Sequence, residues 1–543
     1  MEPVLNETNS ENNTCVEAVS EKTRRDPNPL FPFMGIGSLV YAFLFTFFLY
    51  RNGSGITFPF FTGATCFFFF LYIKRSGITA AKISLFPVVS ILLLGAGVCM
   101  TDSWILILFN KAGIFFLFFY LAIHTLYQDQ GWDISRYLGA VLNIVCTSLI
   151  FIFRPFTDFT DYYKNKKNIE DNTEGKGKYI FFGAVIAIPF LFVILLLLSD
   201  ADAVFSNTLE RIFSFDFEWD FRITEIAFLF LFAFFASYSI LCRLSIHDLK
   251  EEMTDRQRLE PIMGITFTGL VSLVYLAFCY IQIVYLFGGL GTLPENYTYA
   301  SYAREGFFQL VFVCLINLLL VLGCMKYFRK DRILEGILTF ICACTYIMIV
   351  SSAYRMILYI QAYNLTFLRL FVLWALCVIF LLVTGALIMI YRKNFPYARY
   401  CIVIVTALYL IFFFSRPDYR IARYNLAQDT TDYYYLKNLS LDAAPAIYDH
   451  YSKTGFDEED GFWFPDFASH MILKSYDFQV EELDLIWQEA GKCLPGRLSL
   501  RSWNLSRWRA YRAYEQYYRL NPDFAEDVEY HIMRYTGDRL GRP

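Results

Sequence analysis

Residues 367–391 read FLRLFVLWALCVIFLLVTGALIMIY, a run in which Arg369 is the only charged side chain. An α-helix rises 1.5 Å per residue, so about 20 apolar residues cross the roughly 30 Å of hydrocarbon in a bilayer. The run lacks the alternation of apolar and polar residues that is typical of a strand in a membrane barrel. It therefore predicts a helix that spans a membrane.

Similar runs recur along the chain between residues 31 and 414. Further spans are predicted at 31–50, 56–73, 83–100, 104–127, 136–154, 179–199, 222–242, 261–287, 305–325, 333–353 and 397–414. Because lipid offers the backbone no hydrogen bonds, each run is expected to be helical. We predict an all-α, polytopic transmembrane helix bundle with about 12 spans, and 11 to 13 are compatible with the sequence.

The composition supports the same class. Hydrophobic residues make up 56% of the chain and charged residues 18%, whereas soluble domains have about 45–50% and 25%. A single soluble core stops growing at roughly 250–300 residues, so the lipid bilayer is the expected partner of this apolar surface. The net charge of −4 gives no basic surplus, and no nucleic-acid partner is expected.

The character of the chain changes at both ends of the apolar region. Residues 1–30 form a polar N-terminal tail, residues 31–414 the transmembrane helical domain, and residues 415–543 a charged C-terminal domain without a run long enough to span. Within it, Trp508, Tyr511, Tyr514 and Tyr518 recur at helical spacing. They predict an amphipathic helix packed on its own domain, or a basic aromatic surface for lipid headgroups or a partner.

Basic residues predict the orientation of the chain in the cell membrane. Basic connections near 155–178, 243–258, 326–332 and 392–399 alternate with connections that are acidic or nearly free of lysine. Basic loops favour the cytoplasmic side of a membrane. We therefore expect the C-terminal domain to be soluble, mainly helical and extracytoplasmic.

An earlier basic cluster conflicts with this alternation. Lys74, Arg75 and Lys82 mark a loop that should also be cytoplasmic, yet three predicted spans separate it from the 155–178 connection. Three crossings do not return to the same side, so either one span between 83 and 154 is re-entrant or split, or the early basic cluster does not mark a cytoplasmic loop. We expect a break at 104–127, where Asn110 and Lys111 interrupt the apolar run.

Motifs with a specific catalytic mechanism are missing from the sequence. It contains no GxxxxGK[ST] phosphate loop, no HExxH and no GxSxG, and its five histidines are scattered. Most of the 13 cysteines lie in apolar runs, where a thiol packs as a small apolar group. We expect no catalytic residue, no metal ligand and no cofactor.

Polar residues fall at two kinds of position. Inside the spans, three candidates for intramembrane polar roles are Asn110, Lys111 and Asn317. At span ends on the predicted outer side stands a larger polar cluster: Asp200, Asp202, Tyr302, Arg304, Glu305, Tyr354, Arg355 and Arg369. These outer residues either anchor and cap helices at the boundary or line an outward-facing pocket that the C-terminal domain covers.

Five strings carry a resemblance to a known family: YASYAREGFFQL (299–310), SAYRMILYIQAYNLTFLRLF (352–371), ARYNLA (422–427), LSLDAAPAI (439–447) and SWNLSRWRA (502–510). In this order they resemble the prokaryotic multi-pass membrane proteins known as domain of unknown function 4153/4173, over approximately 180–510. The resemblance implies a bacterial cell membrane and a helical C-terminal extension. It implies no activity, so it assigns no residue a catalytic role.

Three functions from different classes fit these features. The first is a non-enzymatic envelope protein that assembles with, or senses, another component; the missing catalytic motifs and the long C-terminal domain favour it. The second is a transporter of a small or lipid-like solute, which predicts a polar cavity reaching the middle of the bilayer. The third is a membrane-embedded enzyme that acts on lipid or glycan, which predicts converging carboxylates. The expected partners are the lipid bilayer and an envelope protein or a small solute.

Overall fold

The computed structural model describes residues 30–77, 84–167, 198, 205, 221–246, 259–287, 307–392, 394–428, 432–454, 501 and 503–520. All regular elements in this part of the chain are helical, which confirms the all-α class. Ten of these helices are long and apolar enough to span a membrane. They begin with α2 (Phe31–Leu49), α3 (Thr57–Arg75), α5 (Trp104–Leu126), α6 (Ile134–Ser148, continued by a 3₁₀ turn at Leu149–Phe151) and α10 (Phe221–Ser245).

The other five follow toward the C-terminal domain. They are α11 (Pro261–Ile281, followed by a π-helical turn at Gln282–Phe287), α13 (Phe307–Tyr327), α14 (Arg332–Tyr363), α15 (Phe367–Tyr391) and α16 (Tyr397–Phe414). Helix α4 (Leu85–Val98) is apolar but shorter. Of the predicted span at 179–199, the structure describes residue 198 alone. The polytopic helix bundle that the sequence predicts is confirmed.

The chain forms two compact units. The smaller one contains Met1–Tyr50, Ala64–Ala80 and Leu142–His247, and the larger one contains Arg51–Gly63, Ala81–Val141 and Asp248–Pro543. The boundary passes through α3 and α6. The predicted limit between membrane domain and C-terminal domain, at 414/415, therefore lies inside the larger unit and stays a prediction.

The smaller unit is built around the contact of α2 with α10. Several of its described polar side chains are hydrogen-bonded to one another. The buried Asp158 of α7 (Arg154–Lys167) accepts hydrogen bonds from Tyr238 Oη at 2.8 Å and from Arg154 Nε at 2.7 Å. Arg243 donates to Thr147 Oγ1 at 2.6 Å. Such bonds join helices where lipid supplies no partner.

In the larger unit, α14 packs against α11, α13 and α15, α15 also packs against α16, and α4 packs on α5 and α16. Two glycines allow the close approach of α4. A Cβ on Gly95 would lie 2.2 Å from Thr62 Oγ1, and one on Gly97 would lie 2.8 Å from the ring of Phe413. Small residues at helix contacts let backbones approach each other closely in a membrane.

Local signals mark where these helices begin. Asp331 caps α14 and accepts the backbone N–H of Ile333 at 2.8 Å, and Thr366 caps α15. A capping oxygen satisfies a backbone donor that the first helical turn leaves free. Helix α14 has 32 residues and is thus about 48 Å long, more than the hydrocarbon layer requires.

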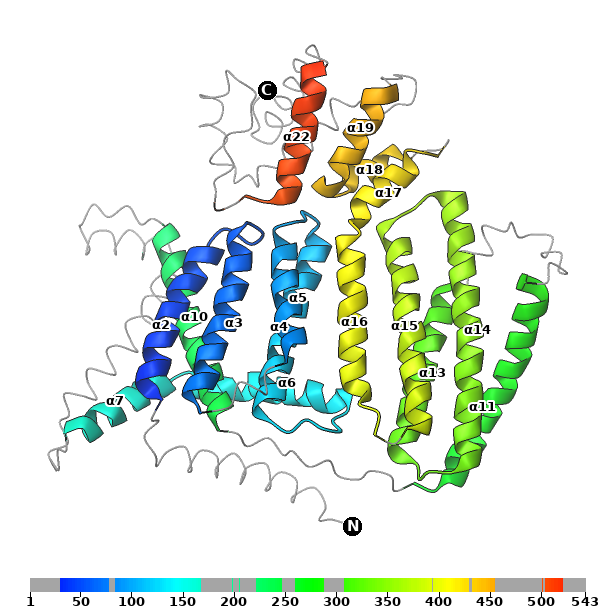
Figure 1. Ribbon diagram of the computed structural model, residues 1–543, viewed down its shortest axis with the longest axis horizontal. Coiled ribbons are helices and arrows are strands. Elements are labelled where there is room, and N and C mark those ends of the chain that lie inside the picture. Colours follow the sequence, from blue (N-terminus) through cyan, green and yellow to red (C-terminus); the bar gives the residue numbers. More distant parts are fainter. Residues whose placement is uncertain are drawn as a thin grey trace. The chain divides into compact units, whose positions relative to one another are not determined.

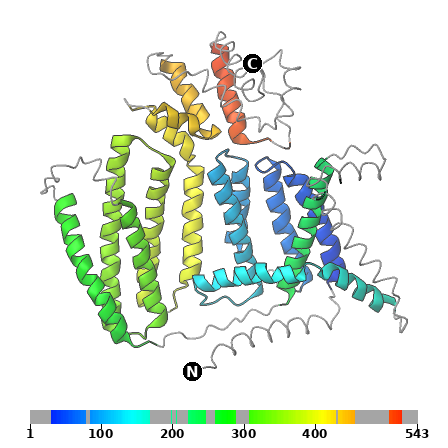
Figure 2. The ribbon, with the colours of Figure 1, turned by 180° about the vertical axis from the view of Figure 1, so that it is seen from behind.

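Helix α5 is continuous over Trp104–Leu126, so the expected break at 104–127 is wrong. The segment that departs from the bundle is α6. Figures 1 and 2 both show it running across the ends of α4 and α5 and not alongside them. Its buried residues recur at helical spacing on one side: Tyr137, Ala140, Val141, Ile144 and Ser148.

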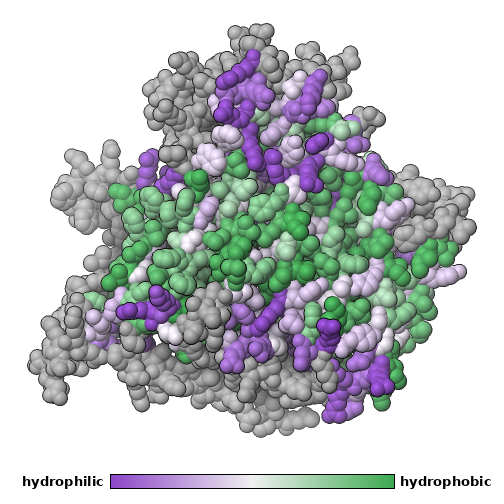
Figure 3. Space-filling model, viewed as in Figure 1, coloured by the Kyte–Doolittle hydropathy of each residue, from purple (hydrophilic) through white to green (hydrophobic). Residues whose placement is uncertain are grey.

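The described part of the C-terminal domain consists of short helices. They are α17 (Pro417–Asn425), α18 (Tyr433–Asn438), a 3₁₀ turn (Leu441–Ala443), α19 (Ala444–Thr454) and α22 (Leu505–Leu520). Within the larger unit they lie beyond the ends of α4, α5 and α16, at the end opposite the α15–α16 connection (Figure 1). Figure 3 shows hydrophobic residues over the middle of the spanning helices and hydrophilic residues over this domain.

The amphipathic helix expected around 501–520 is α22. Its Tyr514 is buried and packs edge-on against Tyr448 of α19, with ring centroids 6.3 Å apart. Trp508 stays 38% exposed. One face of α22 therefore packs on its own domain, as predicted, and another face remains accessible.

Candidate functional site

The C-terminal domain is bound to two turns of the membrane bundle. The backbone N–H of Leu505, the first residue of α22, donates to the carbonyl of Cys99 at 2.8 Å. The N–H of Ile56 donates to the carbonyl of Trp503 at 2.8 Å. We call the contacts of residues 51–56 and 99–103 with the start of α22 the seam.

Asn504 is the centre of the seam and is fully buried. Its Nδ2 donates to the carbonyls of Ser54 and Thr101, both at 3.0 Å. Its Oδ1 accepts the backbone N–H groups of Ser506 at 2.9 Å and Arg507 at 3.3 Å. One side chain thus caps α22 and ties it to both turns of the bundle.

One ion pair and one hydrogen bond of a carboxyl group also join the two sides of the seam. Arg507 Nε lies 3.0 Å from Asp102 Oδ1, and both side chains are largely buried. The buried carboxyl group of Asp442 accepts the hydroxyl of Thr101 at 2.5 Å. Burial raises the pKa of Asp442, against the opposing effects of nearby hydroxyls and of the charges of Arg416 and Arg509.

A second set of contacts binds the α14–α15 turn to the C-terminal domain. Asn425 of α17 accepts the N–H of Leu365 at 2.8 Å and donates to its carbonyl at 2.9 Å. The hydroxyl of Tyr435 accepts the N–H of Phe367 at 2.7 Å. The domain is therefore held in place from two sides.

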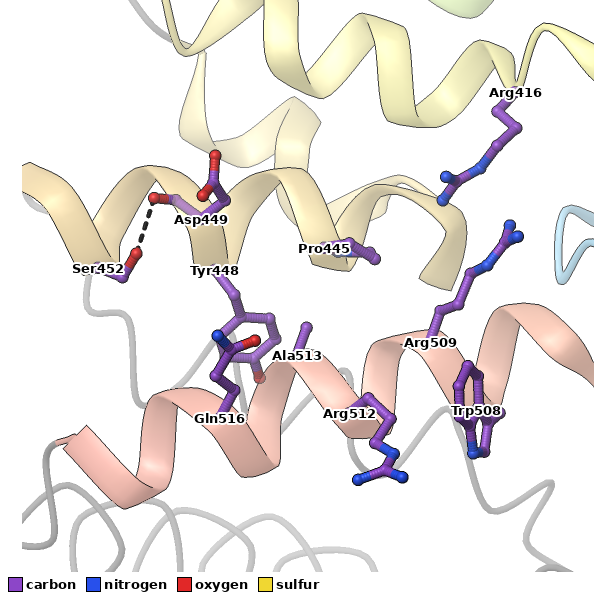
Figure 4. Close-up of a pocket in the computed structure, with 10 residues that line it drawn as sticks. All are labelled: Arg416, Pro445, Tyr448, Asp449, Ser452, Trp508, Arg509, Arg512, Ala513 and Gln516. Carbon is purple, nitrogen blue, oxygen red and sulfur yellow. Dashed lines mark hydrogen bonds between the residues drawn. The ribbon is translucent and has the colours of Figure 1, made fainter.

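A cleft of about 280 Å³ opens in the C-terminal domain between α19 and α22. It is lined by Arg416, Pro445, Tyr448, Asp449, Ser452, Trp508, Arg509, Arg512, Ala513 and Gln516. We call it the arginine cleft. Figure 4 shows the side chains of Arg416 and Arg509 pointing toward one another, one from the start of α17 and the other from α22.

The backbone of Arg416 is unusual. It has φ 55° and ψ 70°, in the left-handed region that residues other than glycine rarely occupy. It stands between the end of α16 at Phe414 and the start of α17 at Pro417. Its guanidinium group lies 4.5 Å from the ring centroid of Tyr419. The turn thus directs a cation into the cleft beside the last spanning helix.

Positive charge dominates the cleft. Asp449 is paired with Lys453 at 2.8 Å, and Arg512 with Glu515 at 3.3 Å. Within the described ranges, neither Arg416 nor Arg509 forms an ion pair. Burial lowers the pKa of Arg509 and the neighbouring charge of Arg416 lowers it further, while Asp442 acts in the opposite direction. Two cations that face each other in this way are suited to hold an anion.

The structure places only part of the predicted outer polar cluster. Asp200, Asp202, Tyr302, Arg304 and Glu305 lie outside the described residues. Of the other three, Tyr354 is 40% exposed, whereas Arg355 is buried and donates to Gln282 Oε1 at 3.2 Å. Arg369 donates to the carbonyls of Tyr363 and Asn364 and lies 4.1 Å from the ring centroid of Tyr359.

These three residues do not line the arginine cleft. Arg369 closes the α14–α15 turn. The outward-facing pocket formed by the whole cluster stays a prediction.

Two of the three predicted intramembrane polar residues form hydrogen bonds between helices. Asn110 accepts the hydroxyl of Tyr409 at 2.7 Å. Asn317 accepts the hydroxyl of Tyr275 at 2.5 Å and donates to Thr345 Oγ1 at 3.0 Å. Hydrogen bonds of this kind join helices in lipid.

Lys111 has a different place. Its ammonium group lies 5.5 Å from the ring centroid of Phe58, and a Cβ on Gly53 would approach it to 3.3 Å. Lys111 therefore reaches the turn at 51–56 with its charged end, as a lysine does that extends toward the membrane boundary.

At the other end of the larger unit, one carboxylate joins three helices. Asp129 is bound by His124 Nδ1 at 2.8 Å, Tyr137 Oη at 2.5 Å and Arg399 Nη2 at 2.6 Å. Burial alone would raise the pKa of Asp129, but the hydrogen bonds of His124 and Tyr137 and the charge of Arg399 together lower it. Lys326 pairs with Asp133 at 2.5 Å close by.

Sequence reasoning predicted a basic aromatic helix in this region and did not identify Arg416. One usable signal was the position of Arg416, the first charged residue after the last span. Across the described ranges, no group of three or more His, Cys, Asp or Glu residues could hold a metal ion.

The helix bundle and the attached helical domain define a multi-pass membrane protein. The chain belongs to the family described as domain of unknown function (DUF4153), whose model matches residues 88–450. This confirms the family resemblance, although the match begins before residue 180 and ends before the SWNLSRWRA string at 502–510. Neither the curated proteins nor the solved structures contain a detectable match to this chain.

Proposed function

We propose that the protein is a non-enzymatic interaction protein of the bacterial cell envelope. Its membrane bundle holds the C-terminal domain at the outer membrane–water boundary, and the arginine cleft binds a negatively charged envelope component. The observation that carries this proposal is the pair Arg416 and Arg509, two cations without an ion-pair partner in the described chain, on a domain bound firmly to the bundle.

The distribution of charge supports an extracytoplasmic C-terminal domain. In the larger unit, basic residues gather at the end opposite that domain: Arg136, Lys326, Arg329, Lys330, Arg332, Arg392 and Arg399. Basic residues near span ends favour the cytoplasm. The crosswise path of α6 supports the same orientation. If α6 lies along the membrane boundary, only α4 and α5 cross the membrane between the early basic loop at 74–82 and the basic connection at 155–178. Two crossings return the chain to the side on which it started.

The interior of the bundle favours binding over transport. Asn110 and Asn317, expected as intramembrane polar residues, are hydrogen-bonded to neighbouring helices. The carboxylates near the cleft also have structural partners, because Asp442 is bound by Thr101 and Asp449 by Lys453. These contacts suit a rigid support for a binding surface.

Site-specific crosslinking in native membranes tests the proposal. A photocrosslinking residue at Gln516, which lines the cleft, should capture an acidic partner, and one at the exposed Tyr434 of α18 should not. Arg509→Glu should abolish the capture. Arg519→Glu is the matched control, because Arg519 is exposed on the same helix and does not line the cleft. Equal capture from both positions, or capture unaffected by Arg509→Glu, would refute the proposal.

A further inference from the structure

Two guanidinium groups converge on one point of the arginine cleft. Arg416 comes from the turn between α16 and α17 and Arg509 from the second turn of α22, so their approach depends on the folded domain. Figure 4 shows the two side chains pointing toward each other. Burial and the charge of Arg416 lower the pKa of Arg509, and a bound anion would relieve the repulsion between the two charges.

The surroundings hold both arginines in place. The strained backbone and the Tyr419 ring direct Arg416. Arg509 lies in α22, and Asn504 binds the start of this helix to the bundle, which fixes the position of Arg509. Strained backbone persists only where the surrounding structure imposes it, and it gathers at ligand sites. The two cations are thus positioned before any ligand arrives.

The number of donors selects the kind of anion. A single guanidinium group satisfies a carboxylate with two parallel hydrogen bonds. A phosphate group has more acceptor oxygens, and two converging guanidinium groups match it better. The cleft of about 280 Å³ is smaller than most sites for drug-sized ligands, so it suits one compact anionic group.

The position of the cleft allows two sources of the phosphate group. Arg416 stands two residues after the last residue of α16, which brings the cleft close to the membrane boundary. Both a phospholipid headgroup and a free phosphate ion can reach this place. Trp508 lines the cleft as well, and its ring lies 5.4 Å from the Arg512 guanidinium.

We propose that Arg416 and Arg509 bind the phosphate group of an anionic ligand in the arginine cleft. The inference rests on the proposed function and names the chemical class of the group that the cleft recognises. Arg512 and Trp508 border the same space and form its outer wall.

The test uses the full-length protein in a maltoside detergent, which carries no phosphate group, titrated with inorganic phosphate. Trp508 is the reporter, and the fluorescence change should be saturable and disappear in Trp508→Phe. Arg509→Gln should weaken phosphate binding at least tenfold and Arg509→Lys less, because lysine keeps the charge and loses the fork of donors. Arg519→Gln, outside the cleft on the same helix, should bind as the unchanged protein does.

Nanodiscs with an anionic phospholipid distinguish the two sources. A headgroup in the cleft would produce the fluorescence change without added phosphate and weaken the later phosphate titration. A preference for free phosphate would leave the titration the same in detergent and in these nanodiscs. Either result supports phosphate recognition.

Three results would overturn the inference: no saturable response to phosphate or anionic lipid, equal binding by Arg509→Gln, or acetate binding as tight as phosphate. Thermal unfolding would show whether Arg509→Gln folds. If it does not, phosphate binding by Arg509→Lys and the competition of acetate with phosphate still test the inference. Loss of phosphate binding with retained, charge-dependent crosslinking at Gln516 would refute only this inference. Phosphate binding without any crosslinked partner would refute only the proposed function.

Discussion

Replacing Asn504 with Ala tests whether the seam holds the C-terminal domain on the membrane bundle. The substitution removes four hydrogen bonds: two donated to Ser54 and Thr101, and two accepted from the start of α22. Loss of the helix cap costs about 1 kcal/mol. A buried carbonyl that loses its donor costs about 1–3 kcal/mol, and Ser54 is only partly buried. We expect a local destabilisation of about 3 kcal/mol.

Hydrogen exchange of the protein in nanodiscs measures this change. Because 1.4 kcal/mol corresponds to a factor of ten, exchange protection in α22 should fall about 100-fold. Protection in α13 to α15 should not change. Asn438→Ala is the matched control, because Asn438 is exposed and its side chain bonds only the carbonyl of Tyr434 in its own helix. Protection in α22 that falls less than threefold would refute the role of Asn504.

Two further predictions concern buried carboxyl groups, and thermal unfolding against pH measures both. Asp129→Asn should destabilise the contact of α5 with α16 by about 2–3 kcal/mol. Loss of a fully buried ion pair would cost more, but Arg399 is partly exposed. The pKa of Asp129 is lower in the folded protein than in the unfolded chain, so ionised Asp129 stabilises the fold above its unfolded pKa. This stabilisation is lost as the pH falls through the pKa of Asp129 in the folded protein. If Asp129→Asn left the dependence of the unfolding temperature on pH unchanged, the prediction would be contradicted. The pKa of Asp442 is raised in the folded protein, so its protonated form stabilises the fold at low pH, and this stabilisation is lost as the pH rises. Asp442→Asn should therefore keep or raise the unfolding temperature at neutral pH.

The sequence alone determined the fold class and most of the spans. The predicted 367–391 and 397–414 coincide with Phe367–Tyr391 and Tyr397–Phe414, because length and unbroken hydrophobicity are local properties that the bilayer imposes. The prediction of 333–353 ended ten residues early, since α14 continues past its most apolar part to Tyr363. A hydropathy pattern reports where lipid begins and ends, and a helix does not have to end there.

Only the tertiary structure decided where the polar residues act. Asn504 donates to Thr101 across 403 positions of the chain, and no periodicity within either segment indicates that contact. The same holds for Arg416 and Arg509, which face each other because the seam and the turn after α16 place them so. The crosswise path of α6 is also invisible in hydropathy, because an apolar helix of this length satisfies its backbone equally well across a bilayer or along its surface. Burial of apolar residues is a local preference, whereas a binding site arises from distant segments that pack together.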